Sequence, residues 1–156
     1  MKTLYPYVVS ACLAGEFCRY DGGSNAHPTV CELVERELAL PICPEYLAGL
    51  PIPRPPCEQR QGRVVNCNGL DVTEAFQRGV ELAMDLVRQY GCRRAVLKAR
   101  SPSCGVGMVY DGSFRKQLIP GDGLWALQLR QAGIALGTEE TLSPDAICRA
   151  LGVHTW

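Results

Sequence analysis

Short apolar runs alternate along the chain with segments in which apolar residues recur at helical spacing. A short apolar run bounded by turn residues predicts a buried strand, and apolar residues three or four positions apart predict one face of a helix. The predicted strands are a run within YPYVVSACL that ends near Ser10 or Ala11, and residues 38–42, 94–99 and 133–138. The predicted helices are residues 29–38, 72–90 and 124–132, and a short last helix that begins at Ser143-Pro144.

This order of elements predicts one domain over residues 1–156 with an α/β fold. Strand-helix-strand connections favour a mostly parallel sheet with helices on both faces, the three-layer arrangement of Rossmann-like and flavodoxin-like proteins. A chain of 156 residues can bury a core of that kind without disulfide bonds. The segment MVYDGSFRKQL predicts a small additional hairpin that turns at Asp111-Gly112. In folds of this class, ligands bind at the carboxyl ends of the strands.

The segment from Cys43 to Gly62 contains five prolines, which exclude a regular helix or a central strand over most of its length. We expect a long, stiff loop there, and loops of that length in compact domains usually serve a binding or catalytic site. Arg54 is expected to pin this loop through a carboxylate, with Glu58 as the candidate partner.

The chain carries 16 basic and 16 acidic residues, so its formal net charge is zero. Balanced charge without a basic stripe weighs against a nucleic-acid partner and an anionic membrane, and it favours a small neutral or weakly charged ligand. Pro6, Glu16 and Arg19 interrupt the apolar start of the chain, which leaves too little length for a signal peptide or a membrane-spanning helix. We therefore expect a cytoplasmic protein, of an oligomeric state that the sequence does not specify.

Nine cysteines are many for a chain expected among reduced thiols. An odd number argues against a complete disulfide framework, and the spacing lacks the paired C-x-x-C modules of structural zinc sites. Cys12, Cys43 and Cys104 lie at or a few residues beyond the ends of three predicted strands, and parallel strands bring such ends together. The cysteines in or beside helices and in the proline-rich loop are expected to be small semi-buried side chains; they are Cys31, Cys57, Cys67, Cys92 and Cys148.

Three converging thiolates are suitable ligands for a zinc ion or for an iron–sulfur cluster. The two histidines, His27 and His154, do not pair with a cysteine at ligand-like spacing. A cubane cluster held by three cysteines leaves one iron without a protein ligand, and that iron would act as a Lewis acid toward sulfur. From spacing alone, a shared metal or cluster site and three unrelated buried thiols stay equally open.

Three segments resemble the signature blocks of the thiouracil desulfurase family: SACLAGEFCRYDGGSN at residues 10–25, CPEYLAGLPIPRPPCE at residues 43–58 and KARSPSCGVG at residues 98–107. The blocks occur in order, and the resemblance covers most of the chain. It implies an enzyme with a [4Fe-4S] cluster on Cys12, Cys43 and Cys104. It also implies a catalytic acid/base at Glu45 and a catalytic hydroxyl at Ser101.

The resemblance further implies non-redox desulfuration of thiouracil, a small thiopyrimidine, in which the open fourth iron binds the substrate sulfur. Glu45 and Ser101 would activate the water that attacks the carbon, so that the thiocarbonyl becomes a carbonyl and hydrosulfide leaves. Glu45 follows Cys43 by two positions, and in an extended segment such residues point to the same side. The sequence therefore places a carboxylate beside the proposed cluster.

Further residues in these blocks are candidates for substrate binding. Arg19, Asp21 and Ser24 would contact the polar edges of a pyrimidine, and Ser103 directly precedes the proposed ligand Cys104. The alternative for the segment RYDGGSN is a structural Asp-Gly-Gly turn stapled by Arg19, and both interpretations stay open.

Two other functions stay open as well. One is a zinc-dependent hydrolase on the same three cysteines, which would hold one zinc in place of roughly four irons. The other is a non-enzymatic iron–sulfur or thiol redox sensor in which Cys12 and Cys18 form a redox pair. A sensor of that kind predicts a reversible disulfide and no loss of sulfur from thiobases.

Overall fold

The computed structural model describes residues 3–151, and none of the helices within that range has the length and apolar character needed to cross a membrane. Its main sheet has four strands in the order β2-β1-β5-β8, and every neighbouring pair is parallel. The strands are β1 (Tyr7–Ser10), β2 (Ala39–Ile42), β5 (Arg94–Leu97) and β8 (Ala135–Thr138).

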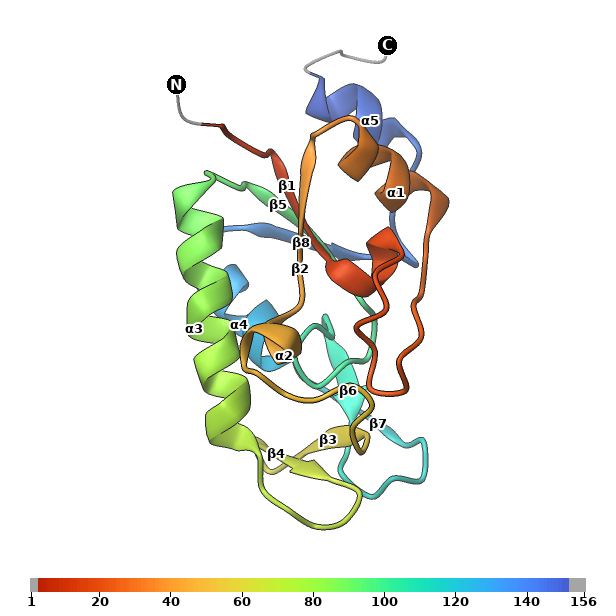
Figure 1. Ribbon diagram of the computed structural model, residues 1–156, viewed down its shortest axis with the longest axis vertical. Coiled ribbons are helices and arrows are strands. Elements are labelled where there is room, and N and C mark those ends of the chain that lie inside the picture. The colour runs from red at the N-terminus through yellow and green to blue at the C-terminus, as the bar shows by residue number, and fades with distance from the viewer. Residues whose placement is uncertain (1–2, 152–156) are drawn as a thin grey trace.

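Helices cover both faces of this sheet (Figure 1). On one face lie α3 (Thr73–Gln89) and α4 (Leu124–Gln131), and on the other lie α1 (Pro28–Glu35) and α5 (Asp145–Ala150). Side chains alternate along β1, so that Val8 packs on the α3–α4 face while Val9 packs on the α1–α5 face. This is the predicted α/β arrangement of three layers, and that prediction is confirmed.

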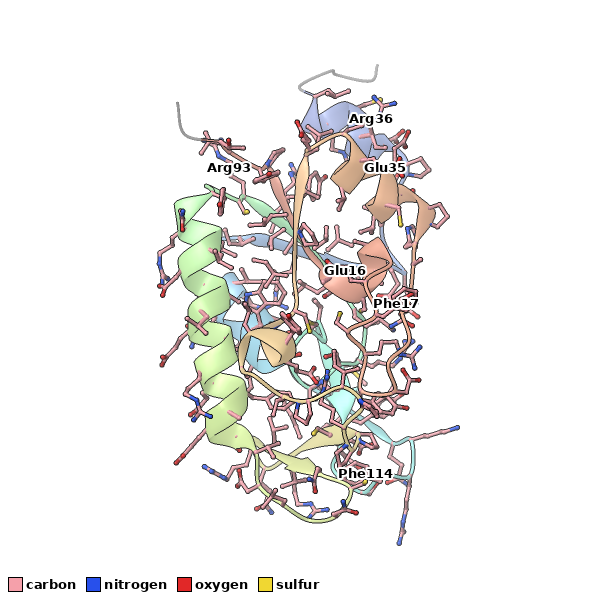
Figure 2. The ribbon with its side chains drawn as sticks, in the orientation of Figure 1. Glu16, Phe17, Glu35, Arg36, Arg93 and Phe114 are labelled. Carbon is pink, nitrogen blue, oxygen red and sulfur yellow. The ribbon has the colours of Figure 1, made fainter. Side chains whose placement is uncertain are left out.

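Two antiparallel hairpins extend the molecule beyond the carboxyl ends of the strands (Figure 1). The pair β6 (Met108–Tyr110) and β7 (Leu118–Pro120) is the predicted hairpin, although its connection spans residues 111–117 and not only Asp111-Gly112. In Figure 2, Phe114 in this connection and Arg93, which precedes β5, lie toward opposite ends of the molecule. The carboxyl ends of the strands therefore face the hairpins.

The proline-rich segment is more ordered than a simple loop, and the prediction was wrong at both of its ends. A one-turn helix, α2 (Pro44–Leu47), begins it, because proline is tolerated in the first turn of a helix. The strand β3 (Cys57–Arg60) ends it and pairs with β4 (Arg63–Asn66). Gln61 and Gly62 connect these strands. Their φ angles, 51° and 78°, are both positive, as a tight two-residue hairpin turn requires.

Three predicted boundaries shift for local reasons. Helix α1 ends before residue 38, because Glu37 adopts a left-handed conformation with φ 58°. Helix α3 starts at Thr73, and the Asp71 carboxylate accepts a hydrogen bond from the Thr73 backbone N–H at 2.9 Å. Strand β5 ends at Leu97, since the Ala99 N–H donates to the Glu139 carboxylate at 2.8 Å and not to a strand.

Helix α2 packs directly against α3, and a glycine makes this approach possible. A Cβ atom at Gly79 would lie 1.9 Å from the carbonyl oxygen of Pro44, far inside contact distance. The sequence of α3 thereby fixes the position of α2, which follows β2 and stands at the carboxyl edge of the sheet.

Candidate active site

Three cysteines meet at the carboxyl edge of the sheet. Cys12 lies in the short 3-10 helix η1 (Ala11–Ala14) directly after β1, Cys43 is the N-cap of α2 directly after β2, and Cys104 lies in the loop that follows β5. All three line one cavity of about 520 Å³. The strand ends therefore bring together the three thiols that the sequence analysis selected.

The thiols differ in how readily they lose a proton. Hydrogen bonding from Cys18, supported by Asn25 and Lys98, lowers the pKa of Cys12 to about 7. The pKa of Cys43 is also lowered, first by Cys18 and then by the backbone N–H of Tyr46, which donates to the Cys43 sulfur at 3.4 Å. Lowered thiol pKa values favour the thiolate form, which is the form that binds a soft metal.

Cys104 is the buried member of the set. It is 5% exposed, and burial raises the pKa of its thiol to about 12. Its nearest polar partners are the Ser10 hydroxyl and the Ser103 hydroxyl, the latter at 3.6 Å from the sulfur. Only a bound cation would deprotonate a thiol in this position near neutral pH.

Cys18 is a fourth thiol at this site. Its hydrogen bonds to Cys12 and Cys43, together with burial, raise its pKa, so it is the group that keeps its proton and donates. Sequence reasoning left its role undecided, because a spacing of six residues from Cys12 does not show that the chain folds back. Cys57 also lines the cavity, and burial raises its pKa to about 12.

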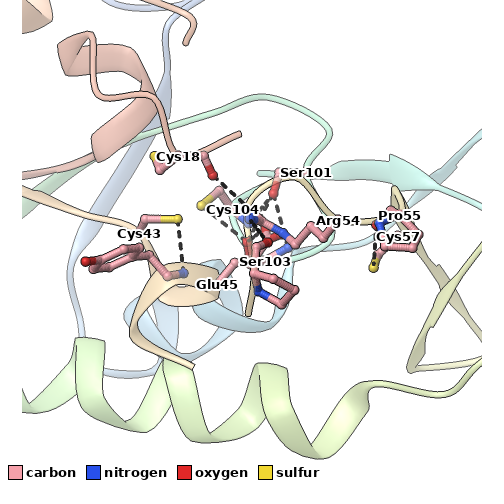
Figure 3. A network of polar contacts seen from close by, with 11 residues as sticks. Cys18, Cys43, Glu45, Arg54, Pro55, Cys57, Ser101, Ser103 and Cys104 are labelled. Carbon is pink, nitrogen blue, oxygen red and sulfur yellow. Dashed lines mark hydrogen bonds and ion pairs between the residues drawn. The ribbon is translucent and has the colours of Figure 1, made fainter. Parts of the chain in front are cut away.

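A chain of hydrogen bonds links Glu45 to Ser101 through Ser103 (Figure 3). Glu45 lies in the first turn of α2, and its Oε2 accepts a hydrogen bond from the Ser103 hydroxyl at 3.0 Å. The Ser103 and Ser101 hydroxyls are 3.1 Å apart. The carboxylate and the hydroxyl predicted to act together thus belong to one network, with Ser103 between them.

The Ser101 oxygen also holds the loop that carries Cys104. It accepts hydrogen bonds from the backbone N–H groups of Ser103 at 3.2 Å and Cys104 at 3.1 Å. Gln59 on β3 fixes the same loop from outside, because its Nε2 donates to the carbonyls of Pro102 at 3.0 Å and Asp122 at 2.9 Å. Hydrogen bonds on two sides therefore position both Ser101 and the Cys104 thiol.

Arg54 reaches this network from the proline-rich segment. Its Nε and Nη2 donate to Glu45 Oε1 at 3.2 Å and 3.0 Å. The carboxylate partner is Glu45, so the expectation that Glu58 fills this place was wrong. Glu58 instead accepts hydrogen bonds from the backbone N–H groups of Gly112 and Phe114 and thereby ties β3 to the β6–β7 connection.

The structure separates the four residues that were candidates for substrate binding. Arg19 and Ser103 line the cavity, whereas Asp21 and Ser24 are absent from its wall as far as residues 3–151 define it. Arg19 donates to Asp21 at 3.1 Å and to Asn25 at 2.9 Å, and Asp21 accepts from the Gly23 N–H at 2.9 Å. These contacts are those of the stapled turn that was the alternative interpretation of this segment.

Comparisons with known proteins identify the family. A family model described as 2-thiouracil desulfurase matches residues 7–141. The chain belongs to the 2-thiouracil desulfurase family. The family predicted from the three sequence blocks is thereby confirmed, and its description names an enzyme, as the sequence also predicted.

Two relatives of this desulfurase show how far the similarity extends. YbbK, an uncharacterised protein of Bacillus subtilis (strain 168), is 35% identical over 146 residues, which cover 87% of this chain and 97% of YbbK. The solved structure of a [4Fe-4S]-dependent thiouracil desulfidase, TudS, is similar with a TM-score of 0.86 and 42% identity. That match covers 94% of this chain and 99% of TudS.

The donor set of this desulfurase fits a cluster better than a single ion. Cys12, Cys43 and Cys104 supply thiols from three loops around one cavity, and thiolates are the ligands that iron–sulfur clusters take. Across residues 3–151, no three His, Cys, Asp or Glu side chains gather closely enough to hold one metal ion. A zinc ion holds every thiolate at about 2.3 Å, whereas each thiolate of a cubane binds a different iron, so the thiolates lie farther apart.

Proposed function

We propose that this chain removes sulfur from thiouracil without a net redox change and releases uracil and hydrosulfide. Membership of the 2-thiouracil desulfurase family and the likeness to TudS support this proposal. The observation that carries it is the shared cavity, whose wall contains Cys12, Cys43 and Cys104 together with the Glu45–Ser103–Ser101 network. A ligand site and a proton-handling site therefore open onto the same space.

Cys12, Cys43 and Cys104 would hold a [4Fe-4S] cluster at this wall. When bound, a cluster with three cysteine ligands supplies an open iron that acts as a Lewis acid toward the thiocarbonyl sulfur. A cavity of about 520 Å³ lies within the range of small-molecule sites, as a thiopyrimidine requires. The reaction balances as a thiocarbonyl plus water giving a carbonyl plus hydrogen sulfide, so no oxidant or reductant is needed.

The chain's own residues handle the protons of this reaction. Glu45 Oε2 is the base, and Ser103 lies within hydrogen-bond distance of both Oε2 and Ser101. A water beside Ser101 can therefore pass a proton through the two hydroxyls to the carboxylate without a large movement of any side chain. The protonated carboxyl can return that proton to the departing sulfur by the same route.

The test is anaerobic reconstitution with iron and sulfide, followed by addition of thiouracil and measurement of uracil and sulfide. Glu45→Ala should keep the bound iron and its absorption but lose about 100-fold or more in turnover, the usual contribution of general acid/base catalysis. Glu32→Ala is the matched control, because this carboxylate is exposed on α1 and forms a salt bridge with Arg36, away from the cavity wall. An iron-loaded parent protein that releases no uracil would overturn the proposal.

A thiol redox sensor is the second candidate, and the contact between Cys12 and Cys18 favours it. It predicts a reversible disulfide between these two residues and no sulfide from thiouracil. Mass spectrometry of the protein after mild oxidation, run beside the turnover assay, separates the two functions. Turnover by the iron-loaded protein excludes a role limited to sensing.

A further inference from the structure

Arg54 places a buried cation at the centre of the site. Its side chain is only 5% exposed, although arginine is among the residues least often buried. Burial of a guanidinium is costly unless its donors and its charge are satisfied. Here Glu45, itself 16% exposed, neutralises the charge, and carbonyl oxygens take further donors.

The guanidinium joins three segments of the chain. Besides the two bonds to Glu45, Nη2 donates to the Cys18 carbonyl at 3.0 Å and Nη1 donates to the Pro51 carbonyl at 3.2 Å. The Arg54 backbone N–H adds a bond to the Tyr20 carbonyl at 2.8 Å. The helix that holds Glu45, the proline-rich segment and the turn that holds Cys18 are therefore tied to one side chain.

These contacts decide which oxygen of Glu45 is free to act. Both N–H groups from Arg54 go to Oε1, so Oε2 is the oxygen that faces the Ser103 hydroxyl. A Glu45 side chain without Arg54 could rotate about its own bonds and turn both carboxylate oxygens away from Ser103. Fixed by the guanidinium, it presents one oxygen to the hydroxyl chain in every turnover.

We propose that Arg54 is a positioning residue for the desulfuration reaction: it holds Glu45 with Oε2 directed at Ser103 and fixes the Cys18 turn against the cavity. This inference rests on the proposed function. Arginine suits this task better than lysine, because its planar fork makes several hydrogen bonds in fixed directions whereas an ammonium group acts as a flexible point charge.

The experiment compares Arg54→Ala and Arg54→Lys with the parent protein after anaerobic reconstitution. Iron content, absorption spectrum, kcat and KM for thiouracil are measured for each. Arg60→Ala is the matched control, because Arg60 also donates from this part of the chain to a loop carbonyl, that of Gly112, but does not touch Glu45. This control should keep the parent kcat to within about threefold, as expected when catalytic groups are not displaced.

Arg54→Ala should lower kcat by about 100-fold with iron content unchanged and KM altered far less, because misplacing a catalytic group acts on the chemical step. Added guanidinium ion should restore part of that kcat in Arg54→Ala and none in Glu45→Ala. Arg54→Lys should lie between the parent and the alanine variant, since it keeps the charge but not the fork.

The outcomes that overturn the inference are distinct from those that overturn the function. Parent-like kcat in Arg54→Lys and Arg54→Ala, or a loss of kcat in strict proportion to lost iron in both, would show that Arg54 does not position Glu45. If Arg54→Ala does not fold, the lysine variant alone decides: full kcat at full iron content then contradicts the need for the fork. Failure of the iron-loaded parent itself would instead refute the proposed function.

Discussion

Replacing Gly79 with alanine tests how closely α2 must approach α3. The added methyl group would lie 1.9 Å from the Pro44 carbonyl oxygen and 2.9 Å from its carbon. A carbon atom and a carbonyl oxygen in favourable contact are about 3.3 Å apart or more. The two helices must therefore separate by roughly 1.4 Å at this point, because the obstacle is backbone and not a side chain that can rotate.

Separating α2 from α3 should lower the free energy of unfolding and should lower kcat more strongly. Overpacking costs about 1–3 kcal/mol, while alanine in a helix interior gains about 1 kcal/mol over glycine. We expect the free energy of unfolding to fall by about 0–2 kcal/mol, the overpacking cost less the gain in helix propensity. Since α2 carries Cys43 at its N-cap and Glu45 in its first turn, a shift of about 1 Å should lower kcat on the order of 100-fold.

Urea denaturation followed by circular dichroism measures the stability, and release of uracil from thiouracil measures the turnover. Gln77→Ala is the matched control, because Gln77 is exposed on the same helix and its replacement changes helix propensity without changing the contact with α2. A Gly79→Ala protein that is about 1 kcal/mol more stable than the parent, with unchanged kcat, would refute the close approach as the reason for glycine.

Three further predictions concern the cavity wall and the core. Cys104→Ser should lose most of the bound iron after reconstitution, and full iron content would contradict its role as a ligand. Gln59→Ala leaves the Pro102 and Asp122 carbonyls without their donor and should lower the free energy of unfolding by about 1–3 kcal/mol in urea; no change would show that solvent replaces the bonds. Burial raises the pKa of Cys92 to about 11 from 9.0, so the unfolded chain ionises first and stability falls as pH rises from about 9 to 11. Cys92→Ala should reduce this fall by about 1 kcal/mol at pH 10, and equal pH dependence in both proteins would contradict the assignment.

The positions of the three proposed ligand cysteines could be predicted from the sequence because they depend on one regular feature. Cys12, Cys43 and Cys104 each follow an apolar run, and parallel strands bring their carboxyl ends together whatever the details of the loops. The spacing of apolar residues also predicted the sheet and the helices that cover it. Apolar residues recur at the positions that face the core, and packing of that core determines the fold.

The contacts of Arg54 could not be predicted, because they depend on how an irregular segment turns in space. The five prolines of this segment indicated a stiff loop, but its one-turn helix and the strand β3 follow from contacts with distant residues. Gly79 supplies the space for α2, and the pairing of Glu58 with Val65 draws the other end into a hairpin. Arg54 pairs with Glu45 and not with Glu58 because of these two contacts, the packing of α2 on Gly79 and the pairing of β3 with β4.

The parallel sheet has a consequence for how the protein folds. Strands β1 and β5 pair directly although the whole of α1, β2, α2, β3, β4 and α3 lies between them in sequence. Contacts between residues so far apart close large loops, and chains that depend on such contacts fold slowly. The thiols of Cys12 and Cys104 come together only after β1 and β5 have paired. Both thiols are therefore exposed to solvent during the slow early stages of folding. In that period the cavity has not yet formed, and oxidants in solution can react with either thiol.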